Sequence, residues 1–201
     1  TTACSNNTST TSTDNLGSST TGAAKIAYGT TPPTGKITTG SFALGAYKAP
    51  KIRYDQNDVI FQNGKCAFNG SQPNEAKLGQ QPGAKAIQLL LDSKFGGGRG
   101  YIYNCRLARG STDTVSMHAS GRAVDTFHYV TNPDDLKRGN EAMGWLIANA
   151  ELIGLQFVVF WRLAWSPKKG IACNTSAFNQ QVHSTHLHFD LNWDGALKNT
   201  P

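Results

Sequence analysis

The sequence lacks any apolar run long enough to cross a bilayer as a helix. Such a helix needs about 20 consecutive apolar residues, and no stretch of the 201 residues approaches that length. A basic run or arginine stripe is also lacking, although Lys and Arg (19) outnumber Asp and Glu (13). The formal charge of +6 suits a polyanion, whether a nucleic acid, an anionic lipid or a cell wall. The scattered lysines argue against a nucleic acid, so we expect neither a membrane span nor a nucleic-acid partner.

Cysteine is scarce, and its four positions lie far apart. No C-x-x-C pair is present, which excludes a thiolate zinc knuckle and a dithiol redox motif. An oxidised framework is expected instead, with one disulfide among Cys66, Cys105 and Cys173. Such a bridge is typical of a protein that is secreted or held in the cell envelope. No signal peptide opens the chain, so we expect any export signal to have been removed. The small residues before Cys4 resemble those before a lipoprotein cysteine, which suggests a lipid anchor there.

The first 21 residues contain 13 Ser or Thr and one charged residue. A stretch of this composition has too little apolar surface to offset the entropy of ordering it. The segment 29–35, Gly-Thr-Thr-Pro-Pro-Thr-Gly, continues this character. We therefore predict a flexible, disordered Ser/Thr-rich tether over residues 1–40 and a single folded domain over residues 41–201.

Within that domain, apolar residues at helical spacing predict a helix over residues 84–94. A second helix is expected from Asn132-Pro133 to about Ala150, because proline and acidic residues suit a helix N-terminus. Runs rich in β-formers predict four strands, at residues 100–106, 122–129, 155–161 and 186–191, with a polar loop at 167–179. These elements indicate an α+β fold with a mostly antiparallel sheet and helices on one side.

All five histidines fall in the second half of the chain, and three lie within six positions. In the strand His186-Leu-His-Phe-Asp-Leu191, side chains alternate between the two faces of a sheet. His186, His188 and Asp190 therefore share one face, while the apolar residues between them face the core. Two imidazoles and a carboxylate on one face suit a metal ion; the alternative is a pair of hydrogen-bonded surface histidines.

A second cluster lies at Ser116-Met-His-Ala-Ser-Gly-Arg-Ala-Val-Asp125. Its spacing lets His118 project from the end of a loop and Asp125 from the following strand, because Gly121 permits a tight backbone between them. Two histidines and one aspartate leave a tetrahedral zinc ion one open position, which is typical of a catalytic site.

Given these residues, the sequence resembles the zinc D-alanyl-D-alanine peptidases and the related peptidoglycan L,D- and D,D-endopeptidases. This superfamily shares its metal site with the lysostaphin-type peptidases and the hedgehog signalling domain. The resemblance covers about residues 100–191. It rests on the signature S-x-H-x-x-G-x-A-x-D and the closing H-x-H pair, which are met here by Ser116, His118, Gly121, Ala123, Asp125, His186 and His188.

The resemblance implies one zinc ion per chain, with three ligands: His118, Asp125 and His188. Many members carry an acid three positions before the last ligand as general base, but that position here is Thr185. The branch with the pattern H-x-x-H-x-H uses imidazoles instead. We therefore expect His186 or His183 to carry the proton, with His186 the closer participant.

Three surrounding residues are also expected to have roles, the first of them implied by the resemblance. Arg106 matches an arginine that orients substrate or stabilises the tetrahedral intermediate in the family, although a salt bridge within the sheet is the alternative. Ser116 is expected to support the site by bonding to the backbone or to Asp125, and Asp190 to steady a ligand imidazole unless it is a surface acid. His128 is expected to point to the opposite face of its strand.

These features predict a monomeric zinc metallopeptidase that hydrolyses the stem peptides or cross-links of peptidoglycan, as a carboxypeptidase or an endopeptidase. The alternative is a zinc-binding module without catalysis, like the hedgehog domain, that binds a partner or the wall. An iron oxygenase is disfavoured because its motif is H-x-D. A nuclease is disfavoured because the acid-rich metal cluster and basic stripe are missing.

Overall fold

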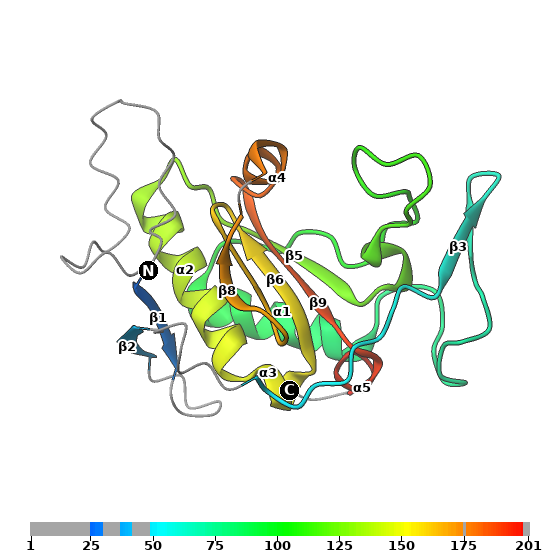
Figure 1. Cartoon of the computed structure of the whole chain (residues 1–201), viewed down its shortest axis with the longest axis horizontal. Helices are drawn as coiled ribbons and strands as arrows, with labels where there is room; N and C mark the ends of the chain where they lie inside the picture. Colours follow the sequence, from blue (N-terminus) through cyan, green and yellow to red (C-terminus); the bar gives the residue numbers. More distant parts are fainter. Residues whose placement is uncertain (1–24, 30–36, 42–48, 175, 199–201) are drawn as a thin grey trace.

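The computed structural model describes residues 25–29, 37–41, 49–174 and 176–198. At its centre lies an antiparallel sheet of five strands in the order β5-β9-β6-β7-β8 (Figure 1). The strands are β5 (Ala123–Phe127), β6 (Leu155–Phe160), β7 (Leu163–Ser166), β8 (Gly170–Cys173) and β9 (His186–Leu191). The long helices α1 (Pro82–Phe95) and α2 (Pro133–Ala148) pack behind this sheet. The predicted α+β class with helices on one side is confirmed.

Smaller elements surround this core. Two further antiparallel pairs are β1 (Lys25–Gly29) with β2 (Ile37–Ser41), and β3 (Val59–Gln62) with β4 (Lys65–Phe68). Short helices are η1 (Met117–Ser120), α3 (Ala150–Ile153), α4 (Ala177–Val182) and α5 (Trp193–Ala196). No helix in the described part of the chain is long and apolar enough to cross a membrane.

Strand β1 and all of β2 except Ser41 lie within residues 1–40, the segment predicted as a disordered tether, and neither strand was predicted. Strand β1 packs beside α2. The rest of the predicted tether, including Cys4 and its suggested lipid anchor, lies outside the described residues.

The two long helices begin at the predicted residue or within two residues of it. Pro133 opens α2, and the side chain of Asn132 accepts hydrogen bonds from the backbone N–H groups of Asp134 and Asp135. Pro82 opens α1, two residues before the predicted start. Both prolines suit a first turn, where an N–H has no partner within the helix.

Three of the four predicted strands are present, and the fourth is not. Strand β9 has the predicted bounds, while β5 and β6 are slightly shorter than expected. The expected strand at 100–106 is wrong: this segment bonds to β5 only around Gly100 and Tyr101. The expected loop at 167–179 is also wrong, because it contains β8 and the start of α4.

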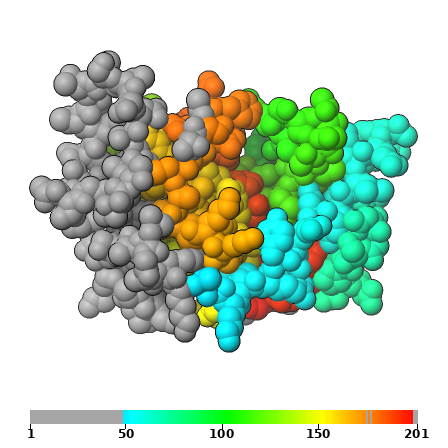
Figure 2. All heavy atoms as spheres, in the orientation of Figure 1, coloured from blue at the N-terminus to red at the C-terminus, as the bar shows by residue number. Residues whose placement is uncertain are grey.

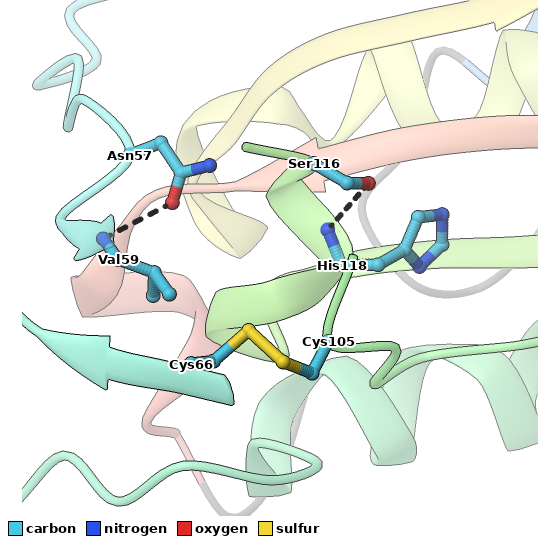
Figure 3. Close-up of a disulfide and its surroundings, with 6 residues drawn as sticks. All are labelled: Asn57, Val59, Cys66, Cys105, Ser116 and His118. Carbon is cyan, nitrogen blue, oxygen red and sulfur yellow. Dashed lines mark hydrogen bonds between the residues drawn. A yellow bond between two sulfur atoms is a disulfide. The ribbon is translucent and has the colours of Figure 1, made fainter. Parts of the chain in front are cut away.

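The predicted disulfide is confirmed as Cys66–Cys105. It joins β4 to the segment that runs beneath His118 (Figure 3). Cys173 is also disulfide-bonded. The Cys66–Cys105 disulfide joins residues 39 positions apart. It stabilises the fold mainly because it lowers the conformational entropy of the unfolded chain.

Gly121 follows η1 in the left-handed region, with φ +72°. A Cβ at this position would lie 1.7 Å from the carbonyl oxygen of Gly79. A side chain here is therefore excluded both by backbone conformation and by a close approach. Gly64, in the turn between β3 and β4, has a similar φ of +76° but no atom within 4 Å of its would-be Cβ.

We expect Gly121→Ala to lower the free energy of unfolding by at least about 2 kcal/mol, because the conformational cost and the clash add. Gly64→Ala is the matched control and should cost only about 1 kcal/mol, the conformational part alone. Denaturant unfolding with the disulfide intact measures both values. Equal losses in the two variants would show that the approach to Gly79 is unimportant.

His128 is fully buried on the helix side of the sheet, as predicted, with its ring edge-on to Phe160. Neither ring nitrogen has a hydrogen-bond partner among the described residues. Burial lowers the pKa of His128 to about 4, and the opposing charges of Asp135 and Arg138 act on it more weakly. The imidazole is therefore held neutral in the folded protein.

An unfolded chain takes up a proton on His128 near pH 6.5, whereas the folded chain does so only near pH 4. Stability should therefore fall as the pH drops through this window, by roughly 3 kcal/mol from this group. In His128→Leu, with chelator present throughout, the fall between pH 7 and pH 4.5 should be smaller by about that amount. Parallel pH curves for both proteins would contradict this assignment.

Candidate metal centre

Strands β5 and β9 bring the two predicted clusters together. Asp125 pairs directly with His188 across the two strands. Alternation places the side chain of His188 on the face opposite to Leu187 and Phe189, which are fully buried against the helices. The imidazole and the carboxylate therefore meet on the face that the helices leave uncovered.

His118 reaches the same point from η1. Ser116 caps this short helix, with its Oγ 3.4 Å from the backbone nitrogen of His118 (Figure 3). Gly121 then turns the chain into β5. The expected supporting role of Ser116 thus takes the form of a cap on the helix that carries His118.

Three side-chain atoms converge at this point. Oδ1 of Asp125 lies 3.3 Å from Nε2 of His118 and 2.9 Å from Nδ1 of His188, and these two nitrogens are 3.2 Å apart. In a tetrahedral zinc site with bonds of 2.0–2.1 Å, neighbouring ligand atoms are separated by roughly 3.3 Å. The three residues could therefore hold a metal ion.

The outer nitrogen of each imidazole is held by an acceptor. Nδ1 of His118 lies 3.1 Å from the carbonyl oxygen of Ile102, and Nε2 of His188 lies 3.1 Å from Oδ1 of Asp190. Because a carbonyl and a carboxylate can only accept, both outer nitrogens donate. The inner nitrogens are then free to offer lone pairs to a cation, which is how proteins commonly orient metal-binding histidines.

The charges of the cluster favour a cation at the same place. Burial alone would raise the pKa of Asp125, but hydrogen bonds with His118 and His188 hold it well below its usual range. Burial alone would lower the pKa of His188, but the carboxylates of Asp190 and Asp125 raise it to about 10. A proton on His188 thus offsets one of the two carboxylate charges, and a bound cation would replace it.

His186 and His183 stand beside this cluster. Nε2 of His186 lies 3.7 Å from Oδ1 of Asp125, and the rings of His183 and His186 are 5.2 Å apart. Nδ1 of His183 donates to the backbone oxygen of Asn179, which leaves its Nε2 as an acceptor. Burial lowers the pKa of both, to about 4 for His183. Both are therefore neutral near pH 7 and able to accept a proton.

Arg106 does not reach the cluster in this structure. Its guanidinium donates to the backbone oxygen of Leu107, 3.0 Å away. The charge of a different arginine, Arg109, is felt at His186, where it acts against protonation.

A hollow of about 730 Å³ opens beside the cluster on the same face of the sheet. In Figure 2, β9 appears at its floor between the strands β6–β8, the loop after Arg106 and the segment that begins at residue 49. His183, His188 and Asp190 line it together with residues that the sequence analysis did not single out: Tyr54, Phe157, Val159, Ala164, Ala172 and Asn179. Of these residues, only those in strands could have been predicted from the sequence. Phe157 and Val159, for example, are two positions apart in β6 and therefore lie on the same face of the sheet.

Comparison with known proteins finds one family model, described as VldE, C-terminal domain, that matches residues 77–188. The match extends from just before α1 to His188 and includes the three metal-cluster residues. No match is found among curated proteins or among solved structures. Because the matched segment spans more than half of the chain, the chain belongs to the VldE C-terminal domain family.

Proposed function

We propose that the protein is a zinc-dependent peptidase that hydrolyses peptide bonds of peptidoglycan stem peptides or cross-links. The observation that carries this proposal is the convergence of Nε2 of His118, Oδ1 of Asp125 and Nδ1 of His188, with the outer nitrogen of each imidazole already bonded. Two imidazoles and one carboxylate leave a tetrahedral zinc ion one open position. The adjoining hollow supplies room for a substrate at that position.

A zinc ion held by these three residues supplies a Lewis acid, which polarises a carbonyl and lowers the pKa of water to about 7. The chain supplies the rest. Asp190 fixes the ring of His188 through its Nε2. His186, 3.7 Å from Asp125, is placed to take a proton from the attacking water, and His183 beside it is placed to assist.

Hydrolysis breaks the C–N bond, adds the water's oxygen to the carbonyl carbon and returns a proton to the leaving amine. Because both histidines are neutral near pH 7, either can accept that proton and give it back. Thr185, at the position where an acid is found in many related peptidases, is exposed, and its Oγ1 lies 3.2 Å from Nδ1 of His186. The hydroxyl thus orients the proposed proton carrier.

Two features support a substrate in the cell wall. The formal charge of +6 favours a polymer that carries phosphate and carboxylate groups. The disulfide Cys66–Cys105 favours an oxidising compartment, in agreement with a secreted or envelope location. The sequence resemblance to peptidoglycan peptidases points in the same direction.

We expect the purified protein to hold one zinc ion per chain. His188→Ala should abolish zinc binding, because it removes a ligand and leaves Asp125 and Asp190 without a partner. His186→Ala is the matched control on the same strand face and should retain the metal. Elemental analysis after dialysis measures both. Equal loss of zinc in the two variants would contradict the division of roles.

We further expect hydrolysis of purified muropeptides, abolished by a chelator and restored by zinc. His186→Ala and His183→Ala, each still loaded with zinc, should lose about 100- to 10,000-fold in turnover, the usual contribution of a proton carrier. Mass spectrometry of digests of several muropeptide chemotypes identifies the bond cut.

Near-normal turnover in both histidine variants would assign the proton to another group. A protein that binds zinc but cleaves none of the muropeptides would instead favour the non-catalytic, hedgehog-like module, which binds a partner or the wall.

A further inference from the structure

The hollow beside the metal cluster extends across the strands of the sheet rather than along one of them. Cross-strand pairing aligns His188 of β9 with Val159 of β6, Ala164 of β7 and Ala172 of β8. Residues paired directly in this way project from the same face of a sheet, and all four line the hollow. The metal cluster therefore stands at one side of a floor that covers three neighbouring strands.

This floor is long enough for several residues of a peptide. Neighbouring strands are about 4.8 Å apart, so three such spacings separate His188 from Ala172 by roughly 14 Å. An extended chain advances about 3.3 Å per residue and covers that span with about four residues. The side chains of Ala164 and Ala172 are single methyl groups, which leave room for the backbone of such a chain.

The end of the hollow at the turn between β7 and β8 carries a positive charge. Lys169 lies in this turn and is the only lysine or arginine among the described residues that line the hollow. Its backbone N–H donates to the carbonyl oxygen of Ser166, which fixes the turn. Within the described part of the chain, its exposed ammonium group forms no ion pair. The charge is therefore available to a ligand.

An aromatic side chain stands at the same end. Tyr54 lines the hollow and is nevertheless 67% exposed. Its segment is fixed to β6, because the side-chain amide of Gln156 accepts from the N–H of Asp55 and donates to the carbonyl oxygen of Asp55. Since Val158 pairs with Trp165, the start of β6 lies beside the turn that carries the lysine (Figure 2). An exposed tyrosine on a fixed segment is typical of a surface that binds a ligand.

The other charges of the hollow direct an anionic group to this end. Asp190 lines the hollow beside the metal cluster, and its carboxylate repels an anion there. The end near α4 is lined by the uncharged side chains of Asn174, Ser176 and Asn179. Apart from the metal cluster itself, Lys169 is therefore the place in the described lining where an anion is most favourable.

We propose that the hollow binds an extended acidic peptide that crosses β6, β7 and β8, and that Lys169 pairs with a carboxylate about four residues from the bond that is cleaved. That the occupant is a peptide rests on the function proposed above. The place of the carboxylate rests on the charges of the hollow. Tyr54 packs against the chain beside this ion pair.

The test uses the zinc-loaded protein and fluorophore-labelled alanine peptides of about nine residues, twice the span of the floor. Each carries one central Glu, or Gln in its place, and fluorescence anisotropy measures its Kd. The Glu peptide should bind about 2- to 5-fold more tightly, the usual effect of an exposed ion pair. Salt at about 0.5 M should remove this preference, because it screens exposed charges.

Lys169→Gln should abolish the preference for Glu, and Lys169→Glu should reverse it in favour of a peptide with a central Lys. Lys168→Gln is the matched control, since this neighbouring exposed lysine does not line the hollow. Tyr54→Ala should weaken the Glu and Gln peptides alike, by about 5- to 30-fold. Mass spectrometry of the same mixtures should place the cut about four residues from the Glu, and the cut should move when the Glu is moved.

Equal affinity for the Glu and Gln peptides, no binding of either, or the same loss in both lysine variants would overturn this proposal and leave the peptidase function standing. So would a cut whose position does not follow the Glu. Binding that depends on Lys169, with no hydrolysis of any peptide or muropeptide, would support the acidic-peptide site and remove the peptidase function.

Discussion

The pairing of Asp125 with His188 across β5 and β9 is the contact on which the rest of the site depends. It fixes one carboxylate oxygen and one imidazole nitrogen 2.9 Å apart, and η1 adds Nε2 of His118 to the same point. Placing three such groups together is unfavourable unless a positive charge lies among them. In the bare chain a proton on His188 serves this purpose, and a metal ion would serve it better because it can bind all three.

Hydrogen bonds to the outer imidazole nitrogens orient the two histidines of the cluster. Ile102 and Asp190 hold the outer nitrogens of His118 and His188 and so turn the inner ones toward each other. The segment that provides Ile102 is fixed by the disulfide at Cys105 and by the hydrogen bond from Asn104 N to His118 O. The disulfide therefore stabilises the site as well as the fold. Gly121 completes the frame, since only a glycine allows η1 to turn into β5 against Gly79.

The centre of the fold and the metal cluster could be predicted because they follow periodic rules. Alternation along residues 186–191 assigned both faces of β9, and the spacing from His118 to Asp125 with Gly121 between them gave the rest of the cluster. Strand β8 and helix α4 could not be predicted, because both are short and carry no apolar periodicity; β8 exists because β7 offers it a partner edge. The residues at 100–106 show the reverse, where strong β-formers turn away to the disulfide after two bonds with β5.

The same division separates the metal cluster from the residues that line the hollow beside it. The metal cluster and both candidate proton carriers lie in or next to β5, β9 and η1, where hydrogen bonds fix positions closely. The lining of the hollow is completed by α4 and by the segment at Tyr54, which sequence periodicity does not constrain. Loops of this kind can change without disturbing the sheet. Related chains with the same cluster can therefore differ in the residues that line the hollow.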